Sequence, residues 1–137
     1  MRWSAGSVSM FLGLGFGIPC VFGIRHFAQT GQVWTFMGFP TYGGGPFERI
    51  GVQTSTPLLV GFLSVCVAEV ALALMLWAGA PHAAAVGYAL LVLELPFWIG
   101  FALPFGPLLG IARTGLLLVM GTTTSPDRMA RLPPGPT

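Results

Sequence analysis

The feature that most constrains this chain is an apolar run from Pro57 to Trp77 that contains a single charge, Glu69. Its twenty-one residues, at about 1.5 Å of helical rise each, match a bilayer hydrocarbon core of about 30 Å. A water-soluble domain of this size has no need for such a run. The segment therefore predicts a transmembrane helix, and we expect an integral membrane protein.

The composition supports the same class. Hydrophobic residues make up 54% of the 137 residues and charged residues only 7%, whereas soluble domains carry about 25% charged residues. So few charges are too few for a water-exposed surface. The net charge of +2 and the absence of a basic stripe argue against nucleic-acid binding. The chain is long enough for one membrane domain of a few helices.

Four apolar segments predict an all-α membrane protein with a four-transmembrane-helix bundle over residues 1–122. The expected helices cover about residues 7–24, 57–77, 83–101 and 104–122. Short connections make consecutive helices antiparallel neighbours. The polar, proline-rich tail, residues 123–137, is expected to be disordered.

Two pairs of glycines are spaced for close helix packing. Gly13 and Gly17 lie one turn apart on the first helix, and Gly106 and Gly110 repeat this spacing on the fourth. Such pairs let a neighbouring backbone approach closely, and we expect packing within the chain rather than homodimerisation. The alternative is that glycine is simply frequent in membrane helices.

The connection between the first two helices, residues 27–56, is long and aromatic. It is expected on the extracytoplasmic side, as a short interfacial helix near residues 33–39 followed by a glycine turn and an ordered loop that caps the bundle. Ordered loops often carry function. Candidates for docking a partner are the loop aromatics Trp34, Phe39, Tyr42 and Phe47.

The arginine distribution gives a preferred orientation. Four helices place both termini on one side of the membrane, and that side carries three arginines against two on the other. The three are Arg2, Arg128 and Arg131, and the two are Arg25 and Arg49. Because cytoplasmic segments are enriched in positive charge, we expect cytoplasmic termini in a plasma membrane.

Three ionisable residues, Glu69, Glu94 and Arg113, fall near the centres of the last three predicted helices. A lone charge at a helix centre costs about 2.5–3.5 kcal/mol, so we expect the three to face one another as a buried polar cluster. Two carboxylates and one guanidinium leave one negative charge. Either one carboxyl keeps a proton, or a further cation joins, for which Arg25 is the candidate. The cluster either fixes helix register or serves as a proton relay, ion path or polar ligand site.

Other site chemistries have little support in the sequence. His26 and His82 fall near opposite ends of the predicted bundle, so no metal site is expected. Cys20 and Cys66 each lie in an apolar run and form no CxxC pair, so they are expected to be free thiols. We expect no cofactor motif, nucleophile–base pair or nucleic-acid partner.

Three motifs together resemble the DoxX-like family of small four-helix membrane proteins. They are the glycine-rich stretch Gly13-Leu-Gly-Phe-Gly17 leading to Arg25, the stretch Val-Ala-Glu69-Val-Ala-Leu-Ala-Leu, and the stretch Ala112-Arg113-Thr-Gly-Leu-Leu-Leu-Val-Met-Gly121. The resemblance implies a four-helix fold and a link to quinone-oxidising or redox membrane complexes. The high glycine, alanine and proline content without lysine suggests a GC-rich bacterial genome.

The leading prediction for function is a non-catalytic accessory subunit that docks on a larger respiratory or transport complex in the membrane. The alternative is a small membrane redox or lipid/quinone-handling enzyme subunit. In that case Glu69 or Glu94 would handle protons, and Trp98, Phe97 and Phe101 would line a hydrophobic slot. A proton-linked transporter is less favoured because no internal repeat is evident.

Overall fold

The structure is a computed structural model and describes residues 1–123, of which 76% are helical. Its elements are α1 (Arg2–Thr30), β1 (Thr35–Phe36), β2 (Phe39–Pro40), α2 (Pro46–Arg49), α3 (Thr56–Ala78), α4 (Ala83–Gly100) and α5 (Phe105–Thr123). The predicted disordered tail from residue 124 onward lies outside the described residues. Residues 1–123 are therefore helical apart from their connections and one small hairpin.

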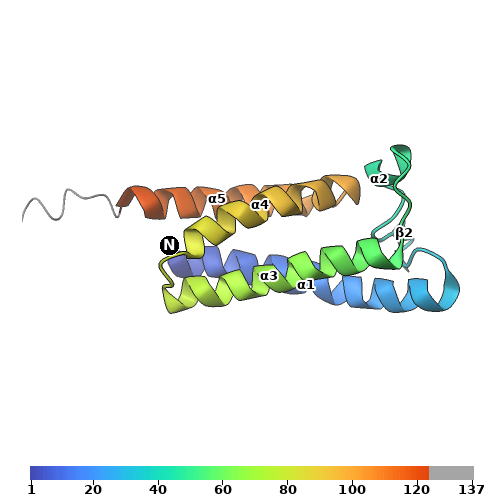
Figure 1. Ribbon diagram of the computed structural model, residues 1–137, viewed down its shortest axis with the longest axis horizontal. Helices are drawn as coiled ribbons and strands as arrows, with labels where there is room; N and C mark the ends of the chain where they lie inside the picture. Colours follow the sequence, from blue (N-terminus) through green and yellow to red (C-terminus); the bar gives the residue numbers. More distant parts are fainter. Residues whose placement is uncertain (124–137) are drawn as a thin grey trace, which may run out of the picture.

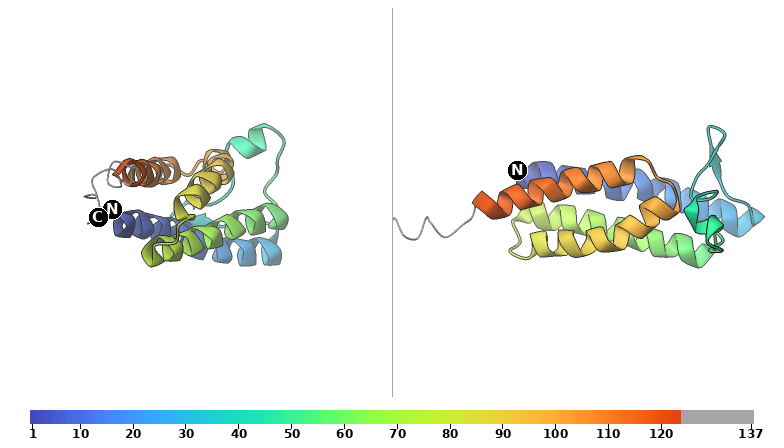
Figure 2. Two further views of the ribbon diagram at one scale, coloured as in Figure 1. Left: turned by 60° about the vertical axis from the view of Figure 1, so that its left-hand side comes forward. Right: turned by 90° about the horizontal axis from the view of Figure 1, so that it is seen from above.

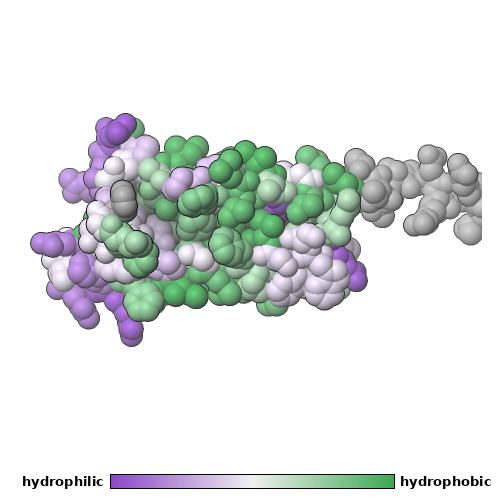
Figure 3. Space-filling view, turned by 180° about the vertical axis from the view of Figure 1, so that it is seen from behind, coloured by the Kyte–Doolittle hydropathy of each residue, from purple (hydrophilic) through white to green (hydrophobic). Residues whose placement is uncertain are grey.

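Three helices, α1, α3 and α4, are long and apolar enough to cross a membrane, with 29, 23 and 18 residues. They indicate a membrane protein. The helix α5 is also apolar, but its apolar part, Phe105–Gly121, is shorter. Hydrophobic side chains cover the middle of the molecule and hydrophilic ones gather toward its ends (Figure 3).

The four long helices run roughly along one axis (Figure 1). α1 packs against α3 and α5, and α4 packs against the same two helices. The N-terminus, the α3–α4 turn and the end of α5 lie at one end of the molecule, and the hairpin and α2 lie at the other (Figure 1). At the first end, Gly79 terminates α3 with a left-handed φ of 72°, a conformation that glycine adopts without strain.

The first helix is longer than the predicted segment 7–24. It continues through Arg25 to Thr30. The next residue, Gly31, caps the helix with a φ of 68°, and its N–H donates to the Phe27 carbonyl. Charged side chains at a membrane boundary do not stop a helix, because arginine has good helix propensity. The glycine after the last turn does. The starts and ends of α3, α4 and α5 lie within one residue of the predicted positions.

Both glycine pairs lie at helix contacts within the chain, as expected. A Cβ on Gly13 would lie 2.7 Å from the Cys66 carbonyl oxygen, so α1 and α3 touch there at backbone distance. On α5, Gly106 and Gly110 leave room for the ring of Trp98 on α4. Small residues thus set the spacing of both helix pairs.

The prediction of a helix near residues 33–39 is wrong. This segment forms an antiparallel hairpin in which Thr35 pairs with Pro40 and Phe36 with Phe39. Met37 and Gly38 form its turn, with positive φ angles of 52° and 82°. Two consecutive positive φ angles are typical of the tight turn of a β-hairpin and are incompatible with a right-handed helix. The helix in this connection is α2, which lies further along the chain and is a single helical turn long.

Candidate functional site

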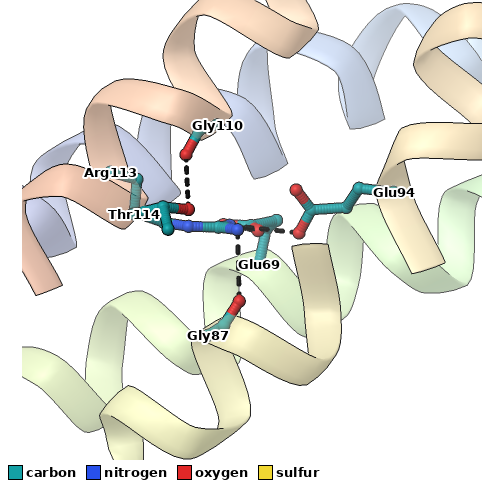
Figure 4. Close-up of polar contacts among 6 residues, drawn as sticks. All are labelled: Glu69, Gly87, Glu94, Gly110, Arg113 and Thr114. Carbon is teal, nitrogen blue, oxygen red and sulfur yellow. Dashed lines mark hydrogen bonds and ion pairs between the residues drawn. The ribbon is translucent and has the colours of Figure 1, made fainter. Parts of the chain in front are cut away.

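The predicted polar cluster exists, and it joins three helices. Arg113 of α5 extends its guanidinium between α3 and α4 (Figure 4). Its Nη1 is ion-paired with Glu69 Oε1 and lies 3.0 Å from Glu94 Oε1. Its Nη2 donates to the Gly87 carbonyl oxygen at 3.3 Å. We call Glu69, Glu94 and Arg113 the ion triad.

The ion triad is sealed from the surroundings of the protein. Arg113 and Glu94 are 0% exposed and Glu69 is 2% exposed. Each residue lies within three positions of the centre of its helix, or about 4 Å along the axis. An ion pair at this depth aligns α3, α4 and α5 along their axes, because a shift by one turn of about 5.4 Å would separate the charges.

Helical periodicity explains why these side chains meet. Each triad residue stands three or four positions from buried neighbours on its own helix. On α3 the neighbours are Cys66 and Leu72, on α4 they are Leu90 and Trp98, and on α5 they are Gly110 and Leu117. Residues at this spacing share one helix face. The charges therefore occupy core positions of an otherwise apolar pattern.

The ion triad carries unmet electrostatic and hydrogen-bonding capacity. With all three groups ionised its formal charge is −1. Glu69 Oε2, Glu94 Oε2 and Arg113 Nε are buried without a hydrogen-bond partner among residues 1–123, and the hydroxyl of Ser9 on α1 is in the same situation. Ser9 was missed by the sequence reasoning. The available signal was a polar residue at the buried phase of α1, four positions after Ala5 and three before Leu12.

Arg25 does not join the ion triad. Its side chain is exposed near the far end of α1. The ion triad lies at the level of Gly13, which faces Cys66 and Val70 on either side of Glu69. Arg25 is twelve residues further along α1, or about 18 Å. The first helix does extend past Arg25, but it places this cation too far along its axis to reach the cluster.

Two surface grooves beside α1 do not open onto the ion triad. A groove between α1 and α3 is lined by residues such as Gly17, Leu63 and Val67, and a groove between α1 and α5 by residues such as Phe16 and Leu109. No triad residue is among the residues that line either groove. In this conformation the cluster is suited to holding helices in register.

Metal-ligating side chains are dispersed in the described part of the chain. Over residues 1–123, no three His, Cys, Asp or Glu side chains are placed to hold a metal ion. Cys20 and Cys66 are both free and buried, and the Cys20 thiol donates to the Leu59 carbonyl oxygen at 3.4 Å. The two thiols thus behave as core side chains.

The loop aromatics are divided between core and surface, so the expectation that all four dock a partner does not hold. Tyr42 is 2% exposed, packs against Phe62 and Phe101, and donates its hydroxyl to the Phe16 carbonyl oxygen at 2.7 Å. Burial raises the pKa of the Tyr42 hydroxyl. The loop therefore inserts this side chain into the end of the helix assembly and is held there by core contacts.

The other three loop aromatics differ from Tyr42. Phe47 is half-buried, with its ring centroid 5.3 Å from that of Phe101. Trp34 is half-buried, and its ring packs at tilted angles against those of Phe22 and Phe36. The side chain of Phe39 lies outside the part of the chain that the structure describes. Trp34 and Phe47 are thus the described candidates that remain partly accessible.

The hydrophobic slot considered for a quinone is filled by protein. Trp98 is 2% exposed, and its ring occupies the space over the α5 glycines. Phe97 and Phe101 pack against Phe62, with ring centroids 5.5 Å away in both cases. These side chains form a packed aromatic cluster toward the end of the molecule that carries α2, so a quinone ring would have to displace them.

Comparison of the chain with known protein families, with curated proteins and with solved structures finds no match.

Proposed function

We propose that the protein is a non-catalytic accessory subunit of a larger membrane complex, such as a respiratory or transport complex. In this proposal α1, α3, α4 and α5 all cross the membrane. The termini lie in the cytoplasm, and the hairpin and α2 lie on the outer face of a plasma membrane.

The observation that carries the proposal is an apolar ridge on α1 with a groove on each side. The ridge consists of Phe11, Leu14, Gly15 and Ile18. Its three large side chains are 64%, 45% and 54% exposed. The spacing of i, i+3, i+4 and i+7 places them on one face. One groove runs between the ridge and α3, and the other between the ridge and α5.

A ridge flanked by grooves fits another transmembrane helix. Helices pack by placing the side-chain rows of one into the grooves of the other. Gly15 lies in the middle of the ridge and touches no residue outside α1 within 4 Å of a Cβ position. An exposed glycine at this point allows close approach by a second backbone. We therefore assign the ridge to a transmembrane helix of the partner complex.

The sealed ion triad favours a structural over a catalytic role. Its charged atoms are enclosed by α3, α4 and α5, and a substrate would have to separate these helices to reach them. The resemblance to DoxX-like proteins fits the proposal, because members of that family are linked to larger redox complexes.

A fourth membrane crossing by α5 is supported by its depth in the molecule. Arg113, near the centre of α5, meets Glu69 and Glu94 near the centres of α3 and α4. A helix of 19 residues extends about 28 Å, which is close to the thickness of the hydrocarbon core. Since α3 and α4 are span candidates, α5 beside them is placed to cross with them.

The test is purification of the tagged protein in mild detergent from its native membrane, followed by mass spectrometry of bound proteins and lipids. We expect stoichiometric recovery of a larger membrane protein assembly. A monodisperse protein that carries a bound quinone or lipid and no protein partner would contradict the proposal and favour the lipid/quinone alternative.

A matched pair of glycine variants tests the ridge itself. Gly15→Leu fills the ridge, and Gly115→Leu adds the same side chain to an exposed position on α5 with nothing within 4 Å. Both substitutions replace a weak helix former by a strong one, so both variants are expected to fold. Gly15→Leu should lose the partner and Gly115→Leu should keep it. Equal recovery of the partner by both variants would remove the ridge as the docking surface.

A further inference from the structure

The hairpin of β1 and β2 projects sideways from the helices. In the view from above it stands away from the helices, close to the end that carries α2 (Figure 2). Among the described elements, β1 and β2 pack only against each other. The hairpin tip carries Phe36 and Met37, which are 58% and 83% exposed. Met37 is the most exposed large apolar side chain in the described part of the chain.

The hairpin belongs to a long stretch without charged side chains. Residues 27–47 contain no Asp, Glu, Lys, Arg or His. The charged or titratable residues that flank this stretch are His26 before it and Glu48 after it. A loop that projects into water typically carries charges. A loop that enters the boundary of a bilayer avoids them because of their insertion cost.

The base of the hairpin lies at the level where α3 begins. The ring of Trp34 packs at a tilt against that of Phe22 on α1, with centroids 6.1 Å apart. The nearby Cys20 thiol bonds to the Leu59 carbonyl in the first turn of α3, which puts Phe22 beside the start of that helix. If α3 spans the bilayer, its start marks the hydrocarbon boundary on this side. Trp34 therefore stands at the depth where tryptophan is enriched in membrane proteins.

The contacts of the Trp34 ring also connect the hairpin to the outward-facing surface of α1. Phe22 is 53% exposed on that surface, and the ring of Phe36 lies 5.8 Å from that of Trp34. Contacts between aromatic rings thus connect α1 to the hairpin tip. Hydrogen bonds within the hairpin pair part of its backbone, including Thr41 N–H to the Trp34 carbonyl at 2.8 Å. The remaining backbone groups confine it to the hydrated boundary, because unpaired groups are costly in hydrocarbon.

We propose that the hairpin, residues 33–41, is a lateral anchor that lies in the headgroup region of the bilayer. Phe36 and Met37 enter the upper acyl-chain layer, and Trp34 stays at headgroup depth. The occupant of this surface is the lipid bilayer itself. A protein partner is the competing occupant. The lack of charged side chains in residues 27–47 favours lipid, because charges are costly to insert into a bilayer.

The test uses a spin label on Met37→Cys in phosphatidylcholine vesicles that contain only this protein. Accessibility to oxygen, which concentrates in lipid, is compared with accessibility to a water-soluble nickel complex. Val67→Cys, in mid-α3 and 62% exposed, is the lipid reference. Gln53→Cys, in the exposed loop before α3, is the water reference. The unsubstituted protein gives the blank, because Cys20 and Cys66 are buried.

We expect the ratio of oxygen to nickel accessibility at position 37 to lie between the two references and several-fold above that of Gln53→Cys. A Met37→Cys label as accessible to nickel as the Gln53→Cys label would overturn the proposal. A label that is water-accessible in vesicles but shielded from both reagents in native membranes would assign the tip to a protein partner instead.

Discussion

A series of isosteric substitutions in the ion triad tests how its charges are balanced. Glu69→Gln and Glu94→Gln each remove one negative charge but keep an oxygen that accepts a hydrogen bond from Arg113. Because the intact cluster has a formal charge of −1, either single variant leaves one neutral guanidinium–carboxylate pair. The double variant leaves Arg113 buried with no anion. The effects should therefore be strongly non-additive.

The distances give the magnitude. A pair of unit charges 3.0 Å apart, as for Arg113 and Glu94, attracts by about 5–6 kcal/mol at an effective dielectric constant of about 20. Most of this attraction offsets desolvation, and loss of the last partner of a buried charge costs about 3–5 kcal/mol. We expect each single variant to lower the free energy of unfolding by about 1 kcal/mol or less, and the double variant by about 3–5 kcal/mol.

The assay is equilibrium unfolding in mixed detergent micelles. Glu48→Gln, at an exposed position in α2, is the control for a loss of charge alone. Independent sites would add to within about 0.5 kcal/mol. The reasoning is refuted if the two single variants each cost several kcal/mol and their sum equals the cost of the double variant. That outcome would mean that both carboxylates are separately required by groups other than Arg113.

Three further predictions concern the packing and the topology. Tyr42→Phe removes the buried hydrogen bond to the Phe16 carbonyl and should lower the free energy of unfolding by about 1 kcal/mol. Tyr88→Phe should have no effect, because the Tyr88 hydroxyl has no hydrogen bond within the described residues. Equal effects of the two substitutions would contradict the insertion of the loop. Gly110→Leu would drive a side chain into the Trp98 ring and should lower the free energy of unfolding by about 1–3 kcal/mol. Thermal unfolding measures this effect, with Gly115→Leu as the control. Equal melting temperatures of the two variants would place α4 and α5 further apart. Single cysteines at Gln53 and Ser125 should react with a membrane-impermeant maleimide from opposite sides of sealed vesicles, and labelling from one side would show that α5 does not cross.

Much of the architecture could be predicted because apolar runs and charge depth carry the information. The run around Glu69 has the length of a membrane span, and Glu94 and Arg113 stand at matching depth in their own segments. Burying three charges separately is costlier than pairing them, so their meeting followed from energetics. The end of α1 could not be predicted equally well, because Arg25 and His26 suit both a helix and an interface. Arg25 was therefore considered as a further member of the ion triad, although it lies too far along α1 to join it.

The loop was predicted less well for physical reasons. Aromatic residues suit a headgroup region and a packed core equally, so composition did not separate buried Tyr42 from the more exposed Trp34. The hairpin has strands of only two residues, too short for an alternating pattern. Its turn places Met37 at positive φ, which residue preferences do not anticipate. Ser9 escaped notice because one hydroxyl scarcely alters an apolar run.

The central claim is that the ion triad is a sealed structural element. Modification by a hydrophobic carbodiimide tests this claim most directly. The reagent reaches carboxyl groups from the lipid phase and reacts with their acid form. The protein is treated in intact membranes, and the modified residues are located by mass spectrometry. The account predicts that Glu69 and Glu94 stay unmodified in the folded protein and become modified after unfolding in detergent. Rapid modification of either residue in the folded protein would show a carboxyl group open to the lipid phase, and would contradict the sealed arrangement in favour of a proton-handling site.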